Sequence, residues 1–328
     1  MARLEDFDET GHGWKVTDAP DDLGAESRTS GMVDQMKQDL GAWREQVKVT
    51  LNERGGFYSV TGDSRVLEYD KLKRVTSILN SINKPFLMPW AANQTARYIN
   101  EKMAITGDQN FIQKSVLSEI ISEAPKAYRR TSGIAASFGT DAHKWMQRIS
   151  DVGIANWVAN SSLLPPLPDQ YRPVVDQWLR WMGNSGLEVI GTEVSVYSPF
   201  SDHHQPEHYG NVTALGGFAG TIDCIAIDPD HPENGVALID YKTGSRIYPE
   251  AALQMTAYRR AFIFSGLMHL LDMGEDIPLR CFVVRVPRVS TESVDVLEVA
   301  HSKWNEDAFD GAVSITKWQG RKEGVWQI

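Results

Sequence analysis

The chain has 328 residues, of which 42% are apolar and 23% are charged, and its 33 Lys and Arg residues against 43 Asp and Glu residues give a formal net charge of −10. These values are typical of a folded globular protein and exclude a disordered or fibrous chain. The only two cysteines, Cys224 and Cys281, exclude a disulfide framework, a cysteine-rich zinc site and a four-cysteine iron–sulfur cluster.

The beginning of the chain is strongly acidic. Residues 1–30 hold eight acidic and three basic side chains, so this segment alone carries a charge of −5. We expect a solvated, flexible tail here, and the segment lacks the basic and apolar stretches of a secretory signal. No apolar run approaches the ~20 residues that a membrane span needs, so we expect an intracellular protein with no membrane partner.

The region of residues 31–130 is predicted to be mostly helical. Between Val33 and Val47, apolar residues recur at spacings of three and four, which predicts one helix with an apolar face. A short strand is predicted at 57–61, two helical segments flank Pro85 and Pro89, and a further helix covers 110–123.

The region of residues 131–328 has an alternating pattern. Helices are predicted at 141–159 and 171–183, followed by three extended runs at 187–198, 218–229 and 235–244. A helix at 249–271, a strand at 279–288 and a final helix at 305–317 complete the chain. This order of a helix, three strands, a helix and a strand predicts an α/β domain with a small mixed sheet.

Charged residues interrupt two of the apolar strands. Alternation places Asp240 and Lys242 on the same face of one strand as Val236, and it places Asp223 on the face of Ile225 in the preceding strand. A buried charge must be paired, hydrated or bound to a metal. If the two strands are neighbours, the two carboxylates converge at one end of the sheet.

Two carboxylates beside a lysine suit the hydrolysis of a phosphodiester. Carboxylate oxygens hold hard divalent cations such as Mg²⁺ or Mn²⁺, which polarise the phosphoryl oxygen and acidify a bound water. The lysine can orient or deprotonate the water, or neutralise charge in the transition state. The alternative interpretation is a structural ion pair between Asp240 and Lys242.

Five motifs in this order resemble a known family. They are GTDAH (139–143), EVSVY (193–197), GFAGTIDCIAI (217–227), LIDYKTG (238–244) and LQMTAY (253–258). They are similar to the motifs of the RecB-type branch of the PD-(D/E)XK nuclease superfamily, in particular of phage-encoded exonucleases. A weaker resemblance extends to RVTSILNSINKPFLMPWA at 74–91.

The resemblance implies a PD-(D/E)XK restriction-endonuclease-like core at 131–328 and a set of site residues. The metal ligands that it implies are His143, Asp223, Asp240 and the backbone carbonyl of Tyr241. The further catalytic residues that it implies are Lys242, Glu193, Gln254 and Tyr258. It implies one or two Mg²⁺ or Mn²⁺ ions, and the two cysteines separate this chain from relatives that hold an iron–sulfur cluster.

Most of the implied residues also have a structural interpretation. His143 suits a helix cap, Glu193 suits an exposed strand position, and Gln254 and Tyr258 suit polar packing on one helix face. The segment SDHHQPEHYG at 201–210 matches no structural zinc motif, so we interpret it as a hydrated loop. Clustering alone suggests a set of phosphate-binding side chains, which are Lys126, Arg129, Arg130, Lys144 and Arg148.

We therefore predict a metal-dependent DNA nuclease, an exonuclease rather than an endonuclease, that acts in recombination, repair or degradation of DNA. The expected location is the cytoplasm of a bacterial or phage-infected cell, and the helical N-terminal half is expected to line a channel for DNA. Three alternatives remain: a nuclease-fold module that binds DNA or a recombination or repair protein without cleaving, an endonuclease with a structure or sequence preference, and a helical N-terminal half that serves mainly as an assembly domain. The sequence leaves the oligomeric state open.

Overall fold

The computed structural model describes residues 23–66, 71–105, 112–200, 216–272 and 277–320. The histidine-rich segment 201–210 and residues 1–22 of the expected tail lie outside these ranges. Helix α1 (Leu23–Gln46) begins within the segment that the sequence predicted to be a tail. The prediction is therefore wrong for residues 23–30, because the helix with the apolar face extends farther toward the N-terminus than its apolar spacing indicated.

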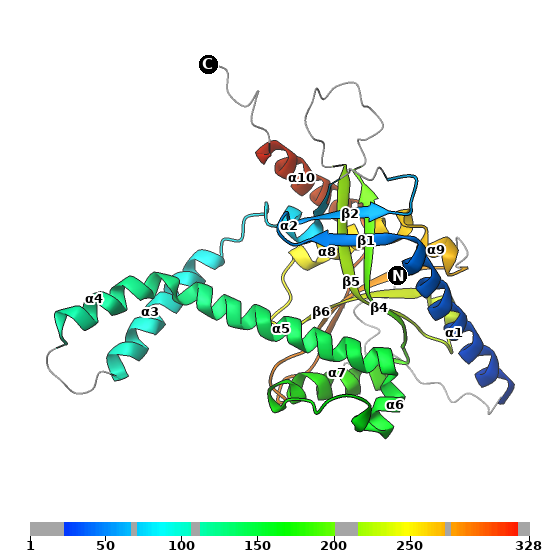
Figure 1. The fold of residues 1–328 in the computed structure, drawn as a ribbon, viewed down its shortest axis with the longest axis horizontal. Helices are drawn as coiled ribbons and strands as arrows, with labels where there is room; N and C mark the ends of the chain where they lie inside the picture. The colour runs from blue at the N-terminus through cyan, green and yellow to red at the C-terminus, as the bar shows by residue number, and fades with distance from the viewer. Residues whose placement is uncertain (1–22, 67–70, 106–111, 201–215, 273–276, 321–328) are drawn as a thin grey trace, which may run out of the picture.

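A single eight-stranded mixed sheet forms the centre of the molecule (Figure 1). Its strands are β1 (Lys48–Asn52), β2 (Phe57–Thr61), β3 (Leu72–Arg74), β4 (Glu188–Pro199), β5 (Gly217–Ile227), β6 (Val236–Lys242), β7 (Leu279–Arg285) and β8 (Asp295–Glu298). The order is β1-β2-β3-β5-β6-β7-β8, and β4 pairs with β5 outside this path. The pairs β3–β5 and β6–β7 are parallel, and all other pairs are antiparallel.

The helices surround this sheet and extend beyond it. They are α2 (Val75–Leu79), α3 (Leu87–Ile105), α4 (Lys114–Glu123), α5 (Ala127–Val152), α6 (Ile154–Ala159), α7 (Arg172–Ser185), α8 (Glu250–Phe264), α9 (Leu267–Leu270) and α10 (Lys303–Gln319). Figure 1 shows α3, α4 and the first half of α5 extending to one side of the sheet. None of the described helices is long and apolar enough to cross a membrane.

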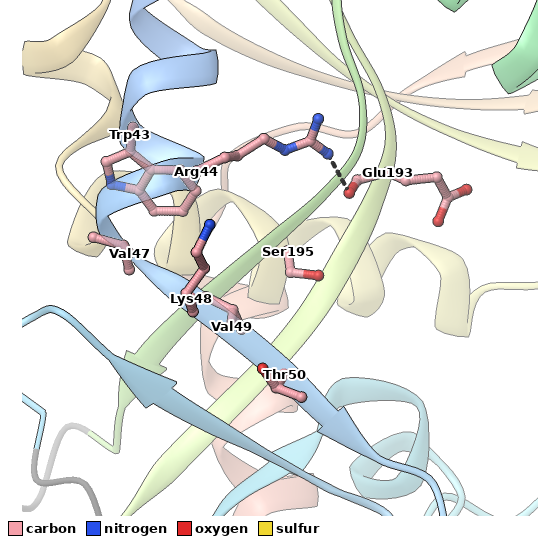
Figure 2. Close-up of a pocket in the computed structure, with 8 residues that line it drawn as sticks. All are labelled: Trp43, Arg44, Val47, Lys48, Val49, Thr50, Glu193 and Ser195. Atoms are coloured by element: carbon pink, nitrogen blue, oxygen red, sulfur yellow. Dashed lines mark hydrogen bonds between the residues drawn. The ribbon is translucent and has the colours of Figure 1, made fainter.

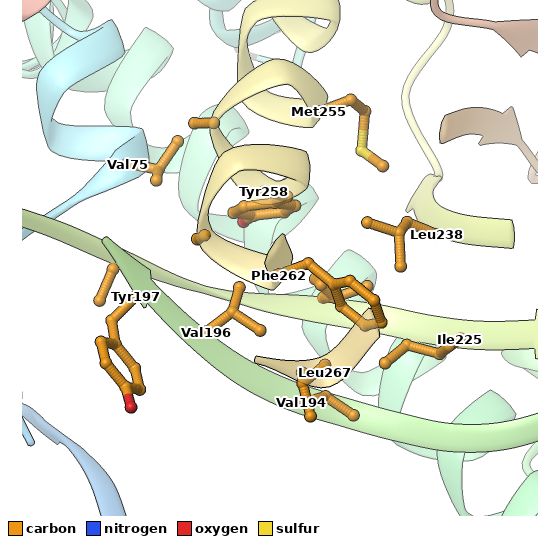
Figure 3. Close-up of a cluster of buried hydrophobic side chains, with 14 of the residues drawn as sticks. Val75, Val194, Val196, Tyr197, Ile225, Leu238, Met255, Tyr258, Phe262 and Leu267 are labelled. Carbon is orange, nitrogen blue, oxygen red and sulfur yellow. The ribbon is translucent and has the colours of Figure 1, made fainter. Parts of the chain in front are cut away.

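The two faces of the sheet pack into separate apolar clusters. Val236 and Leu238 of β6 belong to the cluster under α8, whereas Ile239 and Tyr241 belong to the cluster under α5 and α7. Figure 3 shows Phe262 of α8 packed against β4, β5 and β6 in the first cluster. Burying such a side chain contributes about 1.5–3 kcal/mol to stability. The predicted alternation along β6 is thus confirmed, and Asp240 lies on the α8 side.

The N-terminal region and the predicted nuclease domain share this sheet. Strand β3 pairs in parallel with Gly217–Ala219 of β5, and β1 and β2 extend the sheet from there. The expected boundary after residue 130 falls inside α5. The sheet is mixed, as predicted, but it is larger than the small sheet expected because β1, β3 and β8 join it.

Candidate active site

Three acidic residues occupy one row across β4, β5 and β6. The register pairs Thr192–Cys224 and Val194–Ile222 set Glu193 opposite Asp223. The pair Cys224–Ile239 sets Asp223 beside Asp240 at the next position of the ladder. The strand pairing therefore brings together three acids that are spread over 47 positions of the chain, from 193 to 240.

The strand pairing along one edge of β5 is interrupted next to this row of acids. On that edge, Gly217–Ala219 pair with β3 and Cys224–Ile227 pair with β6. Asp223 lies at the end of this gap and accepts a hydrogen bond from the backbone N–H of Tyr241, with a distance of 2.7 Å. The end of the β6 ladder thus holds the Asp223 carboxylate in place.

His143 contacts Asp223 from α5, which packs on the face of the sheet opposite to α8. It lies on α5, which begins at Ala127, so the residue is within the helix and not near its start as the sequence suggested. Its Nδ1 lies 3.5 Å from Asp223 Oδ2. Burial acts to raise the pKa of Asp223, but His143, Lys242 and the Tyr241 N–H lower it, and the net pKa lies below the ordinary value.

The buried Asp240 and the partly exposed Lys242 form a pair that Gln254 of α8 contacts. The Lys242 Nζ lies 2.6 Å from Asp240 Oδ2 and donates to Gln254 Oε1 at 3.1 Å. The Gln254 Nε2 donates to Asp240 Oδ1 at 2.8 Å and contacts the Tyr258 hydroxyl at 2.9 Å. The i, i+4 spacing of Gln254 and Tyr258 places both on the face of α8 that covers this pair.

The glycine at position 220 makes room for this network. A Cβ atom at Gly220 would lie 2.4 Å from Cε1 of the Tyr258 ring, far inside van der Waals contact. The Tyr258 ring therefore rests directly on the β5 backbone. This close approach sets the position of α8 and, with it, the position of the Gln254 amide.

The charges of the pair depend on their burial. Burial lowers the pKa of Lys242, but Asp240 and Asp223 raise it, and the net pKa lies above the ordinary value. Burial raises the pKa of Asp240, and the negative charge of Asp223 raises it further. The positive charge of Lys242 lowers it, but the net pKa lies above the ordinary value. Lys242 is therefore an ammonium ion in this arrangement.

Glu193 has an unusual backbone conformation for a residue in a strand. Its φ is 48°, in the left-handed region that few residues other than glycine adopt. Arg44 of α1 donates hydrogen bonds to the carbonyls of Thr192 and Glu193, at 2.5 and 2.6 Å. Figure 2 shows Arg44 contacting the backbone oxygen of Glu193 while the carboxyl group points away from the guanidinium.

The environment of the Glu193 carboxyl group favours its neutral form. Burial and the charge of Asp223 raise its pKa to about 7, while His143 and Arg44 oppose the shift. A cavity of about 230 Å³ lies beside this residue, with Arg44 and Glu193 in its lining (Figure 2). The sequence contained no signal for Arg44, because it lies on a helix that is 149 residues away along the chain.

The donor set suits a hard divalent cation. Carboxylates and an imidazole are ligands that Mg²⁺ or Mn²⁺ accepts, and Asp240 Oδ2 is a buried oxygen with no hydrogen bond. The Lys242 ammonium is within ion-pair distance of that oxygen but is not aligned for a hydrogen bond. Within the part of the chain that the structure describes, no group of three or more His, Cys, Asp or Glu side chains is arranged so that it could hold a metal ion, so the role of these residues as metal ligands stays a prediction.

The predicted phosphate-binding side chains lie along α5 and just before it. Glu123 forms ion pairs with Lys126 and Arg130, at 2.6 and 2.9 Å, and Asp141 pairs with Lys144 at 3.2 Å. The guanidinium of Arg148 lies over the Trp145 ring. The structure does not bring these five side chains to the row of acids, so their role in phosphate binding stays a prediction.

Comparison with known proteins adds the family. A family model described as "PD-(D/E)XK nuclease superfamily" matches residues 121–319, which run from the end of α4 to α10. No match was found among curated proteins. The match covers His143 and the whole row of acids, and it leaves α1, β1–β3, α2 and α3 outside. Together with the mixed sheet, it confirms the predicted fold class.

Proposed function

The chain belongs to the PD-(D/E)XK nuclease superfamily, whose members generally use divalent metals, and we propose that it is an exonuclease that hydrolyses phosphodiester bonds in DNA. The observation that carries this proposal is the row of Glu193, Asp223 and Asp240 across three strands, with Lys242 2.6 Å from Asp240. A purely structural ion pair between Asp240 and Lys242 would not require Glu193 or Asp223 beside it.

The metal ligands in this proposal are the residues around Asp223. Asp223, Asp240, His143 and the Tyr241 carbonyl would hold one or two Mg²⁺ or Mn²⁺ ions, with Glu193 as a further carboxylate. Such an ion polarises the phosphoryl oxygen and acidifies a bound water. The proposal includes no iron–sulfur cluster, because the two cysteines of the sequence cannot supply four thiolates.

Lys242 has an electrostatic role in this mechanism. Its ammonium group lies at the end of β6 and neutralises negative charge that develops on the phosphoryl group in the transition state. Gln254 accepts a hydrogen bond from Lys242 and donates one to Asp240, so it fixes the orientation of both side chains. Tyr258 contacts the Gln254 amide, so it acts as a positioning residue.

The preference for an exonuclease rests on the motif resemblance. The order of the motifs around His143, Glu193, Asp223, Asp240 and Gln254 resembles that of the RecB-type branch and its phage members. We infer a role in recombination, repair or degradation of DNA, in the cytoplasm of a bacterial or phage-infected cell. A recombination or repair protein is a further partner in this proposal, and the helices at 31–130 would line the path of the DNA.

Cleavage of end-labelled linear DNA and closed circular DNA tests the proposal. We expect Mg²⁺ or Mn²⁺ to support loss of linear DNA only, and chelation to stop it. Lys242→Ala is expected to lower the rate on the order of 10²- to 10³-fold, because it removes a charge that stabilises the transition state. The matched control is Lys303→Ala, which removes an exposed lysine of α10.

Other outcomes assign the chain to one of the alternatives. Cleavage of the circle would replace the exonuclease with an endonuclease. Binding of DNA without cleavage by the wild type, in either metal, would overturn catalysis and leave a binding module. Thermal unfolding of Lys242→Ala is measured in parallel, since the loss of its cation leaves Asp240 buried without a counter-charge.

A further inference from the structure

A second cavity has Lys242, the lysine of the candidate active site, in its lining. Its volume is about 200 Å³, and Lys242 and Gln254 form one side of it. The other side consists of residues from α2, from the segment after α2, from the loop between β6 and α8 and from the first turn of α8. The charged members of that side are Lys84, Arg246 and Glu250. A ligand in this cavity is therefore adjacent to the bond that the proposed nuclease cleaves.

The charges in this cavity favour an anion. Lys84 pairs with Glu250 at 3.0 Å, which satisfies the one acid among the lining residues. Arg246 is exposed, and the described part of the chain provides no ion-pair partner for it. Lys242 is already paired with Asp240, so Arg246 supplies the net positive charge of this lining. A phosphate group has the charge that this lining leaves unmatched.

A stacked aromatic pair lies at the outer side of the cavity. The rings of Phe86 and Tyr248 have centroids 4.6 Å apart and an interplanar angle of 9°. The Arg246 guanidinium lies 5.0 Å from the Tyr248 centroid and 5.9 Å from the Phe86 centroid. Both rings are only half-buried, so part of their apolar surface remains in contact with solvent.

The apolar surface continues beyond the pair. Leu87 and Met88 at the start of α3 are 44% and 79% exposed. Aromatic rings and a guanidinium that flank a cationic cavity are the groups on which single-stranded nucleic acid stacks its bases. None of the residues of α3 is buried. The aromatic pair is therefore not explained as an anchor that packs α3 against the sheet.

We propose that this cavity binds the nucleotide next to the scissile phosphodiester, with its phosphate at Arg246 and its base stacked on the Phe86–Tyr248 pair. The inference rests on the proposed nuclease function, because the ligand is part of the DNA strand held at Lys242. It also gives the N-terminal region a role at the active site, because Phe86 lies outside the segment that the family model matches.

Binding of single-stranded oligonucleotides with one abasic residue tests the proposal. Fluorescence anisotropy on the full chain, with chelator present, gives the dissociation constant while the abasic residue is moved through the first positions from each end. For the wild type we expect one position at which loss of the base weakens binding by about 5- to 150-fold. Phe86→Leu is expected to bind the intact and abasic strands equally.

Two further variants separate stacking from other effects. Tyr248→Phe keeps the ring, so we expect it to discriminate like the wild type. Trp304→Leu removes an aromatic side chain of α10 that is 86% exposed, and it serves as the control for a general loss of aromatic surface. If Phe86→Leu still distinguishes the abasic strand as the wild type does, the stacking site is overturned.

A fluorescent base in the wild-type complex gives a test that depends on no variant. 2-Aminopurine at the discriminating position is expected to be quenched on binding, because stacking on an aromatic ring quenches it. Unquenched fluorescence would overturn the proposal even if Phe86→Leu fails to fold. Discrimination without metal-dependent cleavage would support the stacking site and overturn the nuclease. Metal-dependent cleavage without discrimination between the intact and abasic strands would support the nuclease and overturn the stacking site.

Discussion

At the scale of single residues, the least expected feature is the contact between Arg44 and the backbone of β4. A residue other than glycine in the left-handed region costs on the order of 1–3 kcal/mol, and Glu193 adopts this conformation within a strand. The two hydrogen bonds from Arg44 hold the carbonyls on either side of that conformation. The strain is therefore localised at one of the three acids of the row.

Arg44→Ala tests whether this contact stabilises the strand. The substitution leaves two carbonyl groups without their charged donor, so we expect the free energy of unfolding to fall by about 1–3 kcal/mol. Urea denaturation measures the change. Lys37→Ala, on the same helix, removes only a half-exposed ion pair with Glu188, for which we expect at most about 1 kcal/mol. Equal urea midpoints for the two variants would contradict the stabilising role of Arg44.

The site residues differ in how far the sequence alone could identify them. Asp240 and Lys242 interrupt an apolar strand, and Asp223 interrupts its neighbour, so alternation predicted their convergence and the strand register shows it. Arg44, Phe86 and Tyr248 gave no such signal. Their partners lie far away in the sequence, and an arginine or an aromatic residue at such positions is also typical of ordinary packing.

At the scale of elements, the contact between the loop after β2 and β4 joins the N-terminal hairpin to the nuclease core. Asp63 forms an ion pair with Arg65 at 2.7 Å and accepts a hydrogen bond from the Tyr197 hydroxyl. Burial acts to raise the pKa of Asp63, but these hydrogen bonds lower it to about 2. The charged form of Asp63 therefore stabilises the folded protein.

The pH dependence of this contribution has a definite sign. Because the pKa is lower in the folded protein than the ordinary value of 3.8, the contribution is fully present above about pH 4 and is lost as the pH falls toward 2. Because the Asp63–Arg65 pair is partly exposed, solvent screening reduces the contribution of a shift of this size to on the order of 1 kcal/mol. We expect the difference in unfolding free energy between wild type and Asp63→Asn to shrink over this window. A difference that stays constant with pH would contradict the argument.

Two of the three strands that the sequence failed to predict lack the pattern by which a strand is identified. Strand β3 has three residues, and all four residues of β8 are exposed, so neither shows the alternation that identifies a half-buried strand. Pro89 was predicted to interrupt a helix, but it lies in the first turn of α3, where proline is tolerated because those N–H groups have no partner within the helix. Predictions of strands therefore fail where alternation is missing, and predictions of helix breaks fail where the proline lies in the first turn.

At the scale of the whole molecule, the net charge of −10 hides the local charge at the site. The cations that we assign to the substrate, Lys242 and Arg246, line one cavity together with the Lys84–Glu250 ion pair. Figure 1 shows why the sequence could not predict this grouping: α2 and the segment before α3 lie beside α8, although they belong to different halves of the chain. The basic side chains of this cavity thus come together where the sheet joins the two halves of the chain.

This localisation predicts how DNA binding responds to salt. Each phosphate neutralised on a single strand contributes about −0.7 to the slope of log K against log salt concentration, so the two contacts at Arg246 and Lys242 give a slope of about −1.4. Raising NaCl from about 50 to about 200 mM should then weaken binding by roughly 7-fold, measured by anisotropy with chelator present. Arg246→Ala should reduce the magnitude of the slope by about 0.7, whereas Lys303→Ala should leave it unchanged. Equal slopes for Arg246→Ala and the wild type would show that the phosphates bind elsewhere, and the basic side chains of α5 would then be the next candidates.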